Sequence, residues 1–217
     1  MRANPAFDPT TRQIRIELKP APPVCTMLFE AMPRRQSTRG DFDGRPVAAE
    51  DLRALEAAGR GDGVRLMLLT EPRQREDILA YLVPAKLAQM RNPAFVQELK
   101  SWIRFGYTDA LSTRDGLFSL CSGNMANPAW IGHPLFNRVF TEAAETRKYE
   151  GQMRTAAGVD IFVSDRNEPA GWFEAGRCCQ RFALQATALG LRLSYINQLE
   201  HHPTNRDHPS DKDARLH

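Results

Sequence analysis

The sequence predicts an α+β fold, and two observations carry that prediction. Several segments place apolar residues at helical spacing, while shorter segments either alternate polar and apolar residues or are mostly apolar, as strands are. These segments do not follow the steady strand–helix–strand rhythm of a parallel sheet, which favours α+β over α/β. The chain has 217 residues, enough for one substantial core, so a single domain is the default expectation.

The first third of the chain is predicted to form a strand, two helices and a second strand. Residues 12–19 alternate polar and apolar side chains and are followed by prolines, which is typical of a half-buried strand. Residues 27–32 predict a short helix. Apolar residues at helical spacing predict a helix over residues 49–59, ended by glycine, and the apolar run 64–69 predicts a central strand.

The middle third is predicted to be helical and then irregular. Apolar residues at near-helical intervals predict helix over residues 73–104, with a break at Asn92-Pro93. Residues 106–134 carry Gly, Asn, Pro and Ser at short intervals together with aromatic residues. We expect a long loop there, which serves either as a lid or binding segment or as a plain surface loop.

The last third is predicted to hold a strand, a long helix and a final strand. The strand covers residues 159–163, which are mostly apolar. Residues 172–189 carry the longest helical pattern, which ends at Gly190 and is nearly apolar all round. We therefore expect this helix to be buried against a sheet or another subunit. Residues 191–196 predict one more strand.

Composition argues against several classes of protein. The net charge of +3 is small and evenly spread, which does not favour a nucleic-acid-binding protein. No apolar run reaches the roughly eighteen residues of a membrane span, and the N-terminus carries no apolar leader, so neither membrane insertion nor secretion is expected. The four cysteines lack C-x-x-C spacing, and Cys178 and Cys179 are adjacent, where a disulfide is strained. We expect reduced thiols in a cytoplasmic protein.

The most informative cluster of polar residues is Arg34-Arg35-Gln36-Ser37-Thr38-Arg39. Arginine presents forked donors that match phosphate oxygens two at a time, and the Ser37 hydroxyl can donate a further hydrogen bond. The cluster therefore predicts a phosphate site. The alternative from the residues alone is a solvated basic turn.

Other reactive residues give weaker signals. The motifs of common nucleotide-binding proteins, zinc proteases and α/β-hydrolases are absent from the sequence. Four of the five histidines lie in the polar C-terminal segment and His133 stands alone, so no metal site is expected. No feature of the sequence indicates a general base for Cys121, so we expect an incidental thiol and not a nucleophile.

Motifs spread over residues 28–198 carry a resemblance to a known family. In chain order they are Leu28-Phe29-Glu30-Ala31-Met32, the cluster 34–39, Phe42, Pro46-Val47, Leu52-Arg53-Ala54-Leu55, Glu98-Leu99, Trp102, Arg104, Asp115-Gly116-Leu117, Trp172-Phe173, Ala175-Gly176-Arg177, Gln180-Arg181, Leu184-Gln185-Ala186-Thr187, Leu189-Gly190-Leu191 and Asn197-Gln198. Together they resemble the nitroreductase family, and most closely its two-repeat branch, in which an ancestral dimer is joined into one chain.

The resemblance implies a particular α+β fold. A central, mostly antiparallel sheet is flanked by helices, with one long buried helix. The corresponding domain would cover residues 25–198. Residues 1–24 would form an N-terminal strand and linker, and residues 199–217 a polar tail that is expected to be disordered.

The resemblance also implies a cofactor and a reaction. Members bind FMN without a covalent bond at a dimer-like interface, and many reduce nitro compounds, quinones or similar small molecules with NAD(P)H. Arg35, Ser37 and Arg39 would contact the FMN phosphate and ribityl chain, with Arg34 and Gln36 beside them, and Asn197 and Gln198 would approach the ring. No catalytic protein residue is required, because the flavin carries the hydride.

Two alternatives to this activity remain open. One is a non-catalytic protein that binds or sequesters flavin. The other is a basic nucleic-acid-binding module, which the lack of aromatic residues among the arginines disfavours. We expect a homodimer that binds neither nucleic acid nor membranes.

The chain departs from the family pattern near both ends. The family continues past its last strand with a further basic pair, whereas residues 201–212 are polar and rich in His, Pro and Asp. We expect a truncated or frame-altered terminus, which the intact coding region can test. Of the preceding repeat only the strand at 12–19 is recognisable, so a second copy is expected to complete the site.

Overall fold

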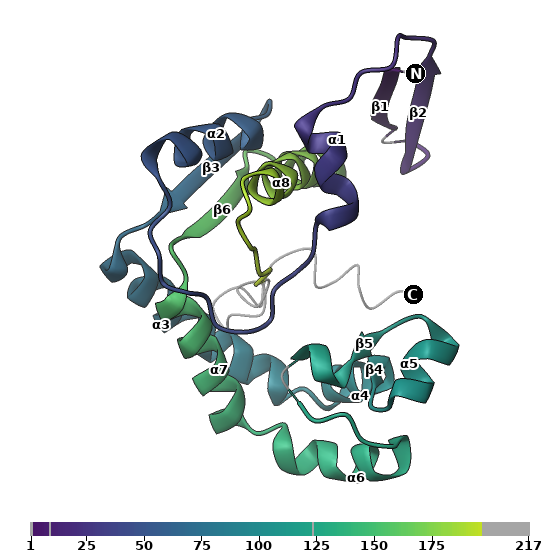
Figure 1. Ribbon diagram of the computed structural model, residues 1–217, viewed down its shortest axis with the longest axis vertical. Helices are drawn as coiled ribbons and strands as arrows, with labels where there is room; N and C mark the ends of the chain where they lie inside the picture. The colour runs from purple at the N-terminus through teal and green to yellow at the C-terminus, as the bar shows by residue number, and fades with distance from the viewer. Residues whose placement is uncertain (1, 9, 123, 197–217) are drawn as a thin grey trace. The chain divides into compact units, whose positions relative to one another are not determined.

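The computed structural model describes residues 2–8, 10–122 and 124–196 (Figure 1). The α-helices are α1 (Met27–Ala31), α2 (Ala49–Gly59), α3 (Pro72–Met90), α4 (Pro93–Trp102), α5 (Tyr107–Thr113), α6 (Ala129–Val139), α7 (Glu142–Thr155) and α8 (Pro169–Ala188). The strands are β1 (Arg2–Asp8), β2 (Gln13–Lys19), β3 (Val64–Leu69), β4 (Ile103–Arg104), β5 (Leu117–Phe118) and β6 (Val159–Ser164). Two 3-10 turns, η1 (Met32–Arg34) and η2 (Ser119–Ser122), complete the elements.

These elements confirm the α+β class, but the sheets are smaller than expected. The described residues form three two-stranded sheets, β1–β2, β3–β6 and β4–β5, in place of one larger central sheet. The first two are antiparallel and the third is parallel. In the described part of the chain, no helix combines the length and apolar character needed to cross a membrane.

The chain divides into two compact units. The first unit takes in the chain up to residue 38 with residues 46–69 and 159–193, and the second takes in residues 39–45, 70–158 and those from 194 onward. The expected domain boundaries at residues 24 and 198 stay predictions, and the expected tail at 199–217 lies outside the described residues.

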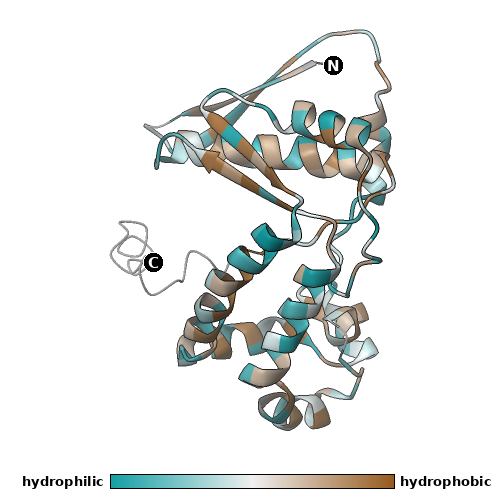
Figure 2. Ribbon diagram, turned by 90° about the vertical axis from the view of Figure 1, so that its left-hand side faces the viewer, coloured by the Kyte–Doolittle hydropathy of each residue, from teal (hydrophilic) through white to brown (hydrophobic). Residues whose placement is uncertain are grey.

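The core of the first unit lies between the β3–β6 sheet and two helices. Alternate residues of a strand point to the same face, so Leu66 and its partner Phe162 both face the helices. They pack around the buried Leu55 of α2 and Phe182 of α8, and the two phenyl rings meet edge to face at 5.6 Å. Figure 2 shows both strands as strongly hydrophobic segments beside these helices. This packing explains why the two apolar runs form strands, as predicted.

The long helix α8 confirms most of the expectation for residues 172–189. It begins earlier, at Pro169, because proline has the right backbone angle for the first helical turn. It ends at Ala188, and Gly190, whose φ of 77° suits glycine, follows two residues later as the expected stop. The Leu191 amide then donates to the Ala186 carbonyl at 2.8 Å. The fully buried residues of α8 lie between positions 178 and 186, whereas Trp172 is exposed, so the helix is not buried along its whole length.

The predicted strand at 12–19 is confirmed as β2, but the expectation that it is half-buried was wrong, because all of its residues are exposed. Its partner β1 was not foreseen. Pro5 masks the strand signal, since proline is tolerated only on edge strands, and in a two-stranded sheet every strand is an edge. The register pairs Phe7 with Ile14 and Pro5 with Ile16.

The second unit is helical at its centre, where α3 packs against α7. The break expected at Asn92-Pro93 is confirmed. The Asn92 side chain accepts hydrogen bonds from the amides of Ala94 and Phe95 at 3.0 and 3.4 Å, and Pro93 occupies the first position of α4. Asparagine followed by proline therefore ends one helix and starts the next.

Two expectations for irregular or extended chain were wrong. Residues 106–134 are not a long loop, because they form α5, β5, η2 and the start of α6. The Arg104 guanidinium holds this region, donating to Thr113 Oγ1 at 3.2 Å and to Asp115 Oδ1 at 2.9 Å. Residues 191–196 are not a strand, and only Leu193 forms an isolated bridge, parallel to Ser37. Helix α7 was not predicted, because its sequence is mostly polar.

Asp160 on β6 is a carboxylate in the first unit whose burial affects stability. It pairs with Leu68 and alternates with Phe162, so it shares the strand face that meets the core. Burial raises the pKa of its carboxyl above the ordinary 3.8. The unfolded chain releases this proton at lower pH than the folded chain, so Asp160 reduces stability as pH rises through the window above 3.8.

We expect Asp160→Asn to raise the melting temperature by about 2–4 °C at about pH 7, which corresponds to about 1 kcal/mol. The gain should disappear at about pH 3, below the unfolded pKa of 3.8, where the carboxyl is protonated in both states. Thermal melts of both proteins at the two pH values check this. An equal gain at both would show that packing, and not charge, causes it.

Candidate functional site

The predicted phosphate cluster follows α1, and the sequence around α1 explains how it is placed. Thr26 caps the helix, because its side-chain Oγ1 accepts a hydrogen bond from the Phe29 amide at 3.2 Å. Ala31 is completely buried, and α1 packs on α8. The chain then makes the turn η1 and becomes extended at Arg35, with φ −66° and ψ 130°. The cap of α1 and its packing on α8 therefore fix the position at which the arginine cluster leaves the helix.

Residues 35–38 run beside the segment that follows α8. The Thr38 amide donates to the Leu193 carbonyl at 2.7 Å, and Ser37 forms a parallel bridge with Leu193. Side chains alternate along an extended chain, so Arg35 and Ser37 share one side and Gln36 takes the other. Residues 35–38 are thus held in the first unit by α1 and by Leu193.

The side chains of this segment have few partners in the protein. Arg34 is exposed, and its Nε donates to the Glu30 carbonyl at 3.3 Å. Arg35 is half-buried, while Gln36 and Ser37 are exposed. Within the described residues no carboxylate forms an ion pair with Arg34 or Arg35, unlike Arg91, which pairs with Glu142 at 2.8 Å. Two unpaired guanidiniums and a hydroxyl are suitable donors for a phosphate group.

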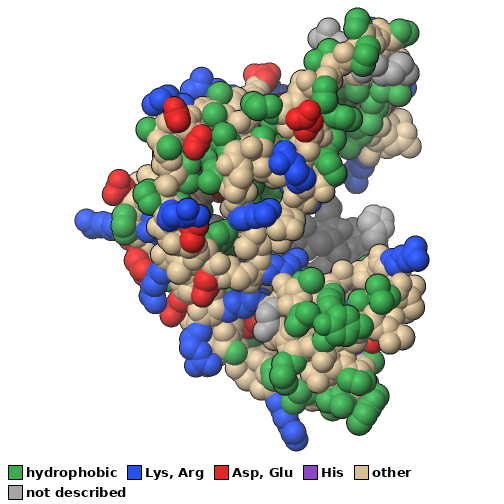
Figure 3. Space-filling view, viewed as in Figure 1, with side chains coloured by type: hydrophobic (Ala, Val, Ile, Leu, Met, Phe, Trp, Pro, Cys, Tyr) green, Lys and Arg blue, Asp and Glu red, His purple; other side chains and the backbone are tan. Residues whose placement is uncertain are grey.

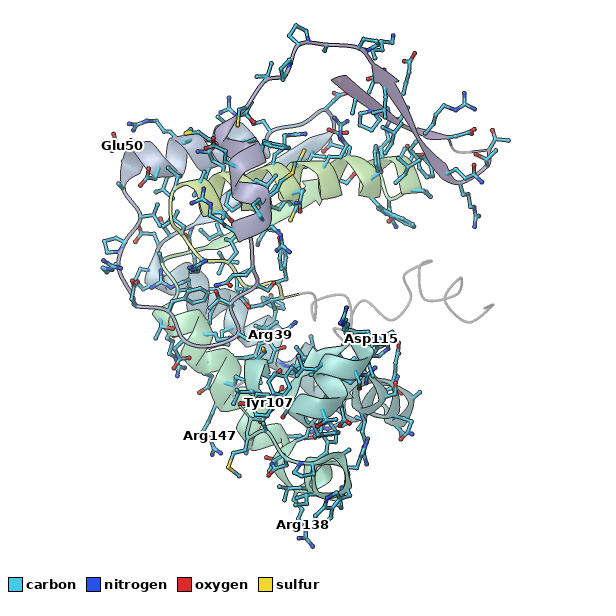
Figure 4. All side chains as sticks on the ribbon, turned by 45° about the vertical axis from the view of Figure 1, so that its right-hand side comes forward. Arg39, Glu50, Tyr107, Asp115, Arg138 and Arg147 are labelled. Carbon is cyan, nitrogen blue, oxygen red and sulfur yellow. The ribbon has the colours of Figure 1, made fainter. Side chains whose placement is uncertain are left out.

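The remaining predicted site residues are Arg39, Asn197 and Gln198. Arg39, labelled in Figure 4, is exposed and belongs to the second unit. There its charge favours ionisation of Tyr149, but burial and the charge of Glu145 dominate and raise the pKa of Tyr149 to about 12. Asn197 and Gln198 lie outside the described residues. The structure therefore groups Arg34, Arg35, Gln36 and Ser37, which are four of the seven predicted residues.

A buried lysine in the second unit is the main feature that the sequence reasoning missed. The ammonium of Lys86 on α3 lies 5.9 Å from the ring centre of Phe95, 5.5 Å from that of Phe140 and 5.3 Å from that of Tyr149. It pairs with Glu145 of α7 at 3.4 Å, and the two side chains are only 7% and 17% exposed. Burial lowers the pKa of Lys86, and Glu145 partly opposes this effect. We call this group the lysine cage.

One sequence signal could have revealed the lysine cage. Lys86 follows Leu79 and Leu82 by seven and four residues, so it lies on the apolar face of α3. A charged residue at such a position needs a partner, because burying an unpaired charge is costly. The identity of the partner depends on the packing of α7 against α3, which spacing does not reveal.

The second unit also exposes apolar side chains around β4, α5 and α6. Five of them are at least half exposed: Trp102, Tyr107, Leu111, Met125 and Trp130. Figure 3 shows hydrophobic atoms over this region. Figure 4 labels two residues of the same region, Tyr107 and Asp115. Tyr107 also packs on Phe118 with ring centres 5.0 Å apart.

The described residues give little support for a cysteine nucleophile or a metal site. Cys25, Cys121 and Cys178 are free thiols, and Cys121 is exposed. Among the residues that the structure describes, no three His, Cys, Asp or Glu side chains gather into a possible metal site. A hollow of about 400 Å³ lies on the polar face of the β1–β2 hairpin, lined by Asn4, Ala6, Arg15 and Glu17, and no residue of the arginine segment lines it.

Comparison of the chain with protein-family models, with curated proteins and with solved structures finds no match.

Proposed function

We propose that this protein is a cytoplasmic, FMN-dependent oxidoreductase of nitroreductase-like fold. It would transfer hydride from NAD(P)H through the flavin to a nitro compound, a quinone or a similar oxidised small molecule. One observation carries the proposal: Arg34, Arg35 and Ser37 lie on one short segment whose backbone is held by α1 and by Leu193, and neither arginine has a carboxylate partner among the described residues.

The donor set suits the phosphate end of FMN. Arg35 and Ser37 lie on the same side of the extended segment, where a forked guanidinium and a hydroxyl donate to different oxygens of one phosphate. Arg34, one residue earlier, adds a second positive charge at the end of η1. When bound, FMN supplies the hydride chemistry, and these residues hold and orient its phosphate.

The proposal also includes a homodimer. Asn197 and Gln198 remain the predicted contacts to the flavin ring.

Flavin binding and reduction of the purified full chain test the proposal. After incubation with FMN and removal of free flavin, the protein should be yellow, and NADH or NADPH should bleach it in the absence of oxygen. A yellow protein that neither nucleotide bleaches would support the alternative, a protein that only binds or sequesters flavin. A protein that stays colourless after added FMN would overturn both readings.

A further inference from the structure

The β1–β2 hairpin has one entirely apolar face. Residues directly opposite in an antiparallel pair lie on the same face of the sheet, and the register pairs Ala3 with Leu18, Pro5 with Ile16 and Phe7 with Ile14. The charged residues occupy the other face. They include Asp8, Arg15, Glu17 and Lys19. We call the apolar side the hairpin face.

Most of the hairpin face is uncovered. Ile14, Ile16 and Leu18 are 54%, 58% and 56% exposed. At one end Phe7 lies near Phe173 of α8, with ring centres 6.4 Å apart. An isolated two-stranded hairpin is only marginally stable in water, and packing of its apolar side against another surface is what stabilises it.

The exposed apolar surface continues into the next part of the chain. Four side chains from the end of the hairpin to the first residue of η1 are more than half exposed: Val24, Met27, Phe29 and Met32. Figure 3 shows hydrophobic atoms over the hairpin and along the chain that leads from it towards α1. At roughly 100 Å² each, these four and the three of β2 present about 700 Å², close to the ~800 Å² that each partner buries in a standard protein interface.

We propose that the hairpin face, together with the exposed apolar side chains of residues 24–32, binds the same surface of a second copy of this chain. The combined area of about 700 Å² is close to what each partner buries in a stable dimer. An identical partner also suits the charge pattern, because two copies of an uncharged face meet without like-charge repulsion or buried charge. The charged face carries both signs, with Glu17 and Asp8 beside Arg15 and Lys19, and so is not the uniformly basic surface that binds an anionic membrane or nucleic acid.

The inference is independent of flavin binding. A colourless preparation that still dimerises through the hairpin face would leave it intact, while the proposed function would fail. It adds a specific contact surface to the homodimer that the proposed function includes.

Two glutamate variants of the full chain test the hairpin face. Ile16→Glu places a charge at the centre of this face, and Ala6→Glu places the same charge on the opposite face, across from Arg15. Sedimentation equilibrium over micromolar concentrations should find the native chain and Ala6→Glu dimeric. The dimer dissociation constant of Ile16→Glu should rise about 100-fold or more, because the interface would bury an unpaired charge. Circular dichroism checks that all three proteins are folded.

A mixing experiment separates lost association from lost folding. Ile16→Lys should be monomeric by itself, like Ile16→Glu, and the two should associate when mixed because opposite charges then meet near the two-fold axis. A native chain that is monomeric throughout the concentration range would overturn the proposal. So would an Ile16→Glu variant that dimerises as well as the native chain, or a monomeric native chain that floats with anionic phospholipid vesicles.

Discussion

Glu145→Ala is expected to reduce the free energy of unfolding by about 3 kcal/mol, the scale measured when one partner of a buried ion pair is removed. The substitution would leave the Lys86 ammonium buried among Phe95, Phe140 and Tyr149 without its carboxylate at 3.4 Å. A contact between a cation and an aromatic ring contributes about 0.5–2 kcal/mol. This is too little to replace both the carboxylate partner and the water that the buried ammonium has lost. Urea denaturation at neutral pH measures the change.

Two further variants show whether the lysine cage is the cause. Glu150→Ala removes a carboxylate from the same helix, but its ion pair with Arg154 lies at the surface, so the loss should stay below about 1 kcal/mol. Replacing both partners, Lys86→Met with Glu145→Leu, removes both charges and should return the stability to within about 1 kcal/mol of the native chain, or above it. If Glu145→Ala costs no more than Glu150→Ala, the buried pair is not important for stability.

Arg35→Ala is expected to weaken FMN binding by about 1.5–3 kcal/mol, or roughly 10- to 150-fold, which is the range for a hydrogen bond to a charged group. Arg35 is half-buried and has no carboxylate partner among the described residues, so its guanidinium is free to bind an anion. Fluorescence titration of FMN with the purified protein measures the dissociation constant.

Riboflavin and a second arginine provide the controls for this prediction. Riboflavin lacks the phosphate, so its affinity should be weak and should change little in Arg35→Ala. Arg53 is an exposed arginine of α2 in the same unit, and Arg53→Ala should leave FMN affinity unchanged. Equal losses in both variants would show a general effect of positive charge, and an unchanged affinity in Arg35→Ala would remove this residue from the phosphate site.

Segments with a long or simple pattern were predicted well from the sequence. The helix at 49–59 and the strand at 64–69 have the predicted bounds, and the break at Asn92-Pro93 lies between α3 and α4. In each case a local cause is sufficient: helical spacing of apolar residues, a capping side chain, or a proline that starts a helix. The residues of the cluster 34–39 are neighbours in the chain, and a phosphate site there stays a prediction.

The short helix predicted at 27–32 is confirmed as α1, but several other short or polar elements were not predicted. The strands β4 and β5 contain two residues each, and they form because Arg104 links the segments around them through Thr113 and Asp115. Helix α7 has little apolar periodicity of its own and packs along α3. In these places long-range contacts override local preference, which is weak over a few residues.

By itself the sequence determined which segments are helices and strands wherever a periodic pattern runs for several turns, and it determined that three arginines and a serine lie within six residues. Only the tertiary structure decided that Ser37 and Thr38 are held by Leu193, that Lys86 is enclosed by three aromatic rings, and that the hairpin face is uncovered. The reason is physical. Helical and strand periodicity is a property of neighbouring residues, whereas the burial of a charge or the exposure of an apolar face depends on residues that are distant in the chain.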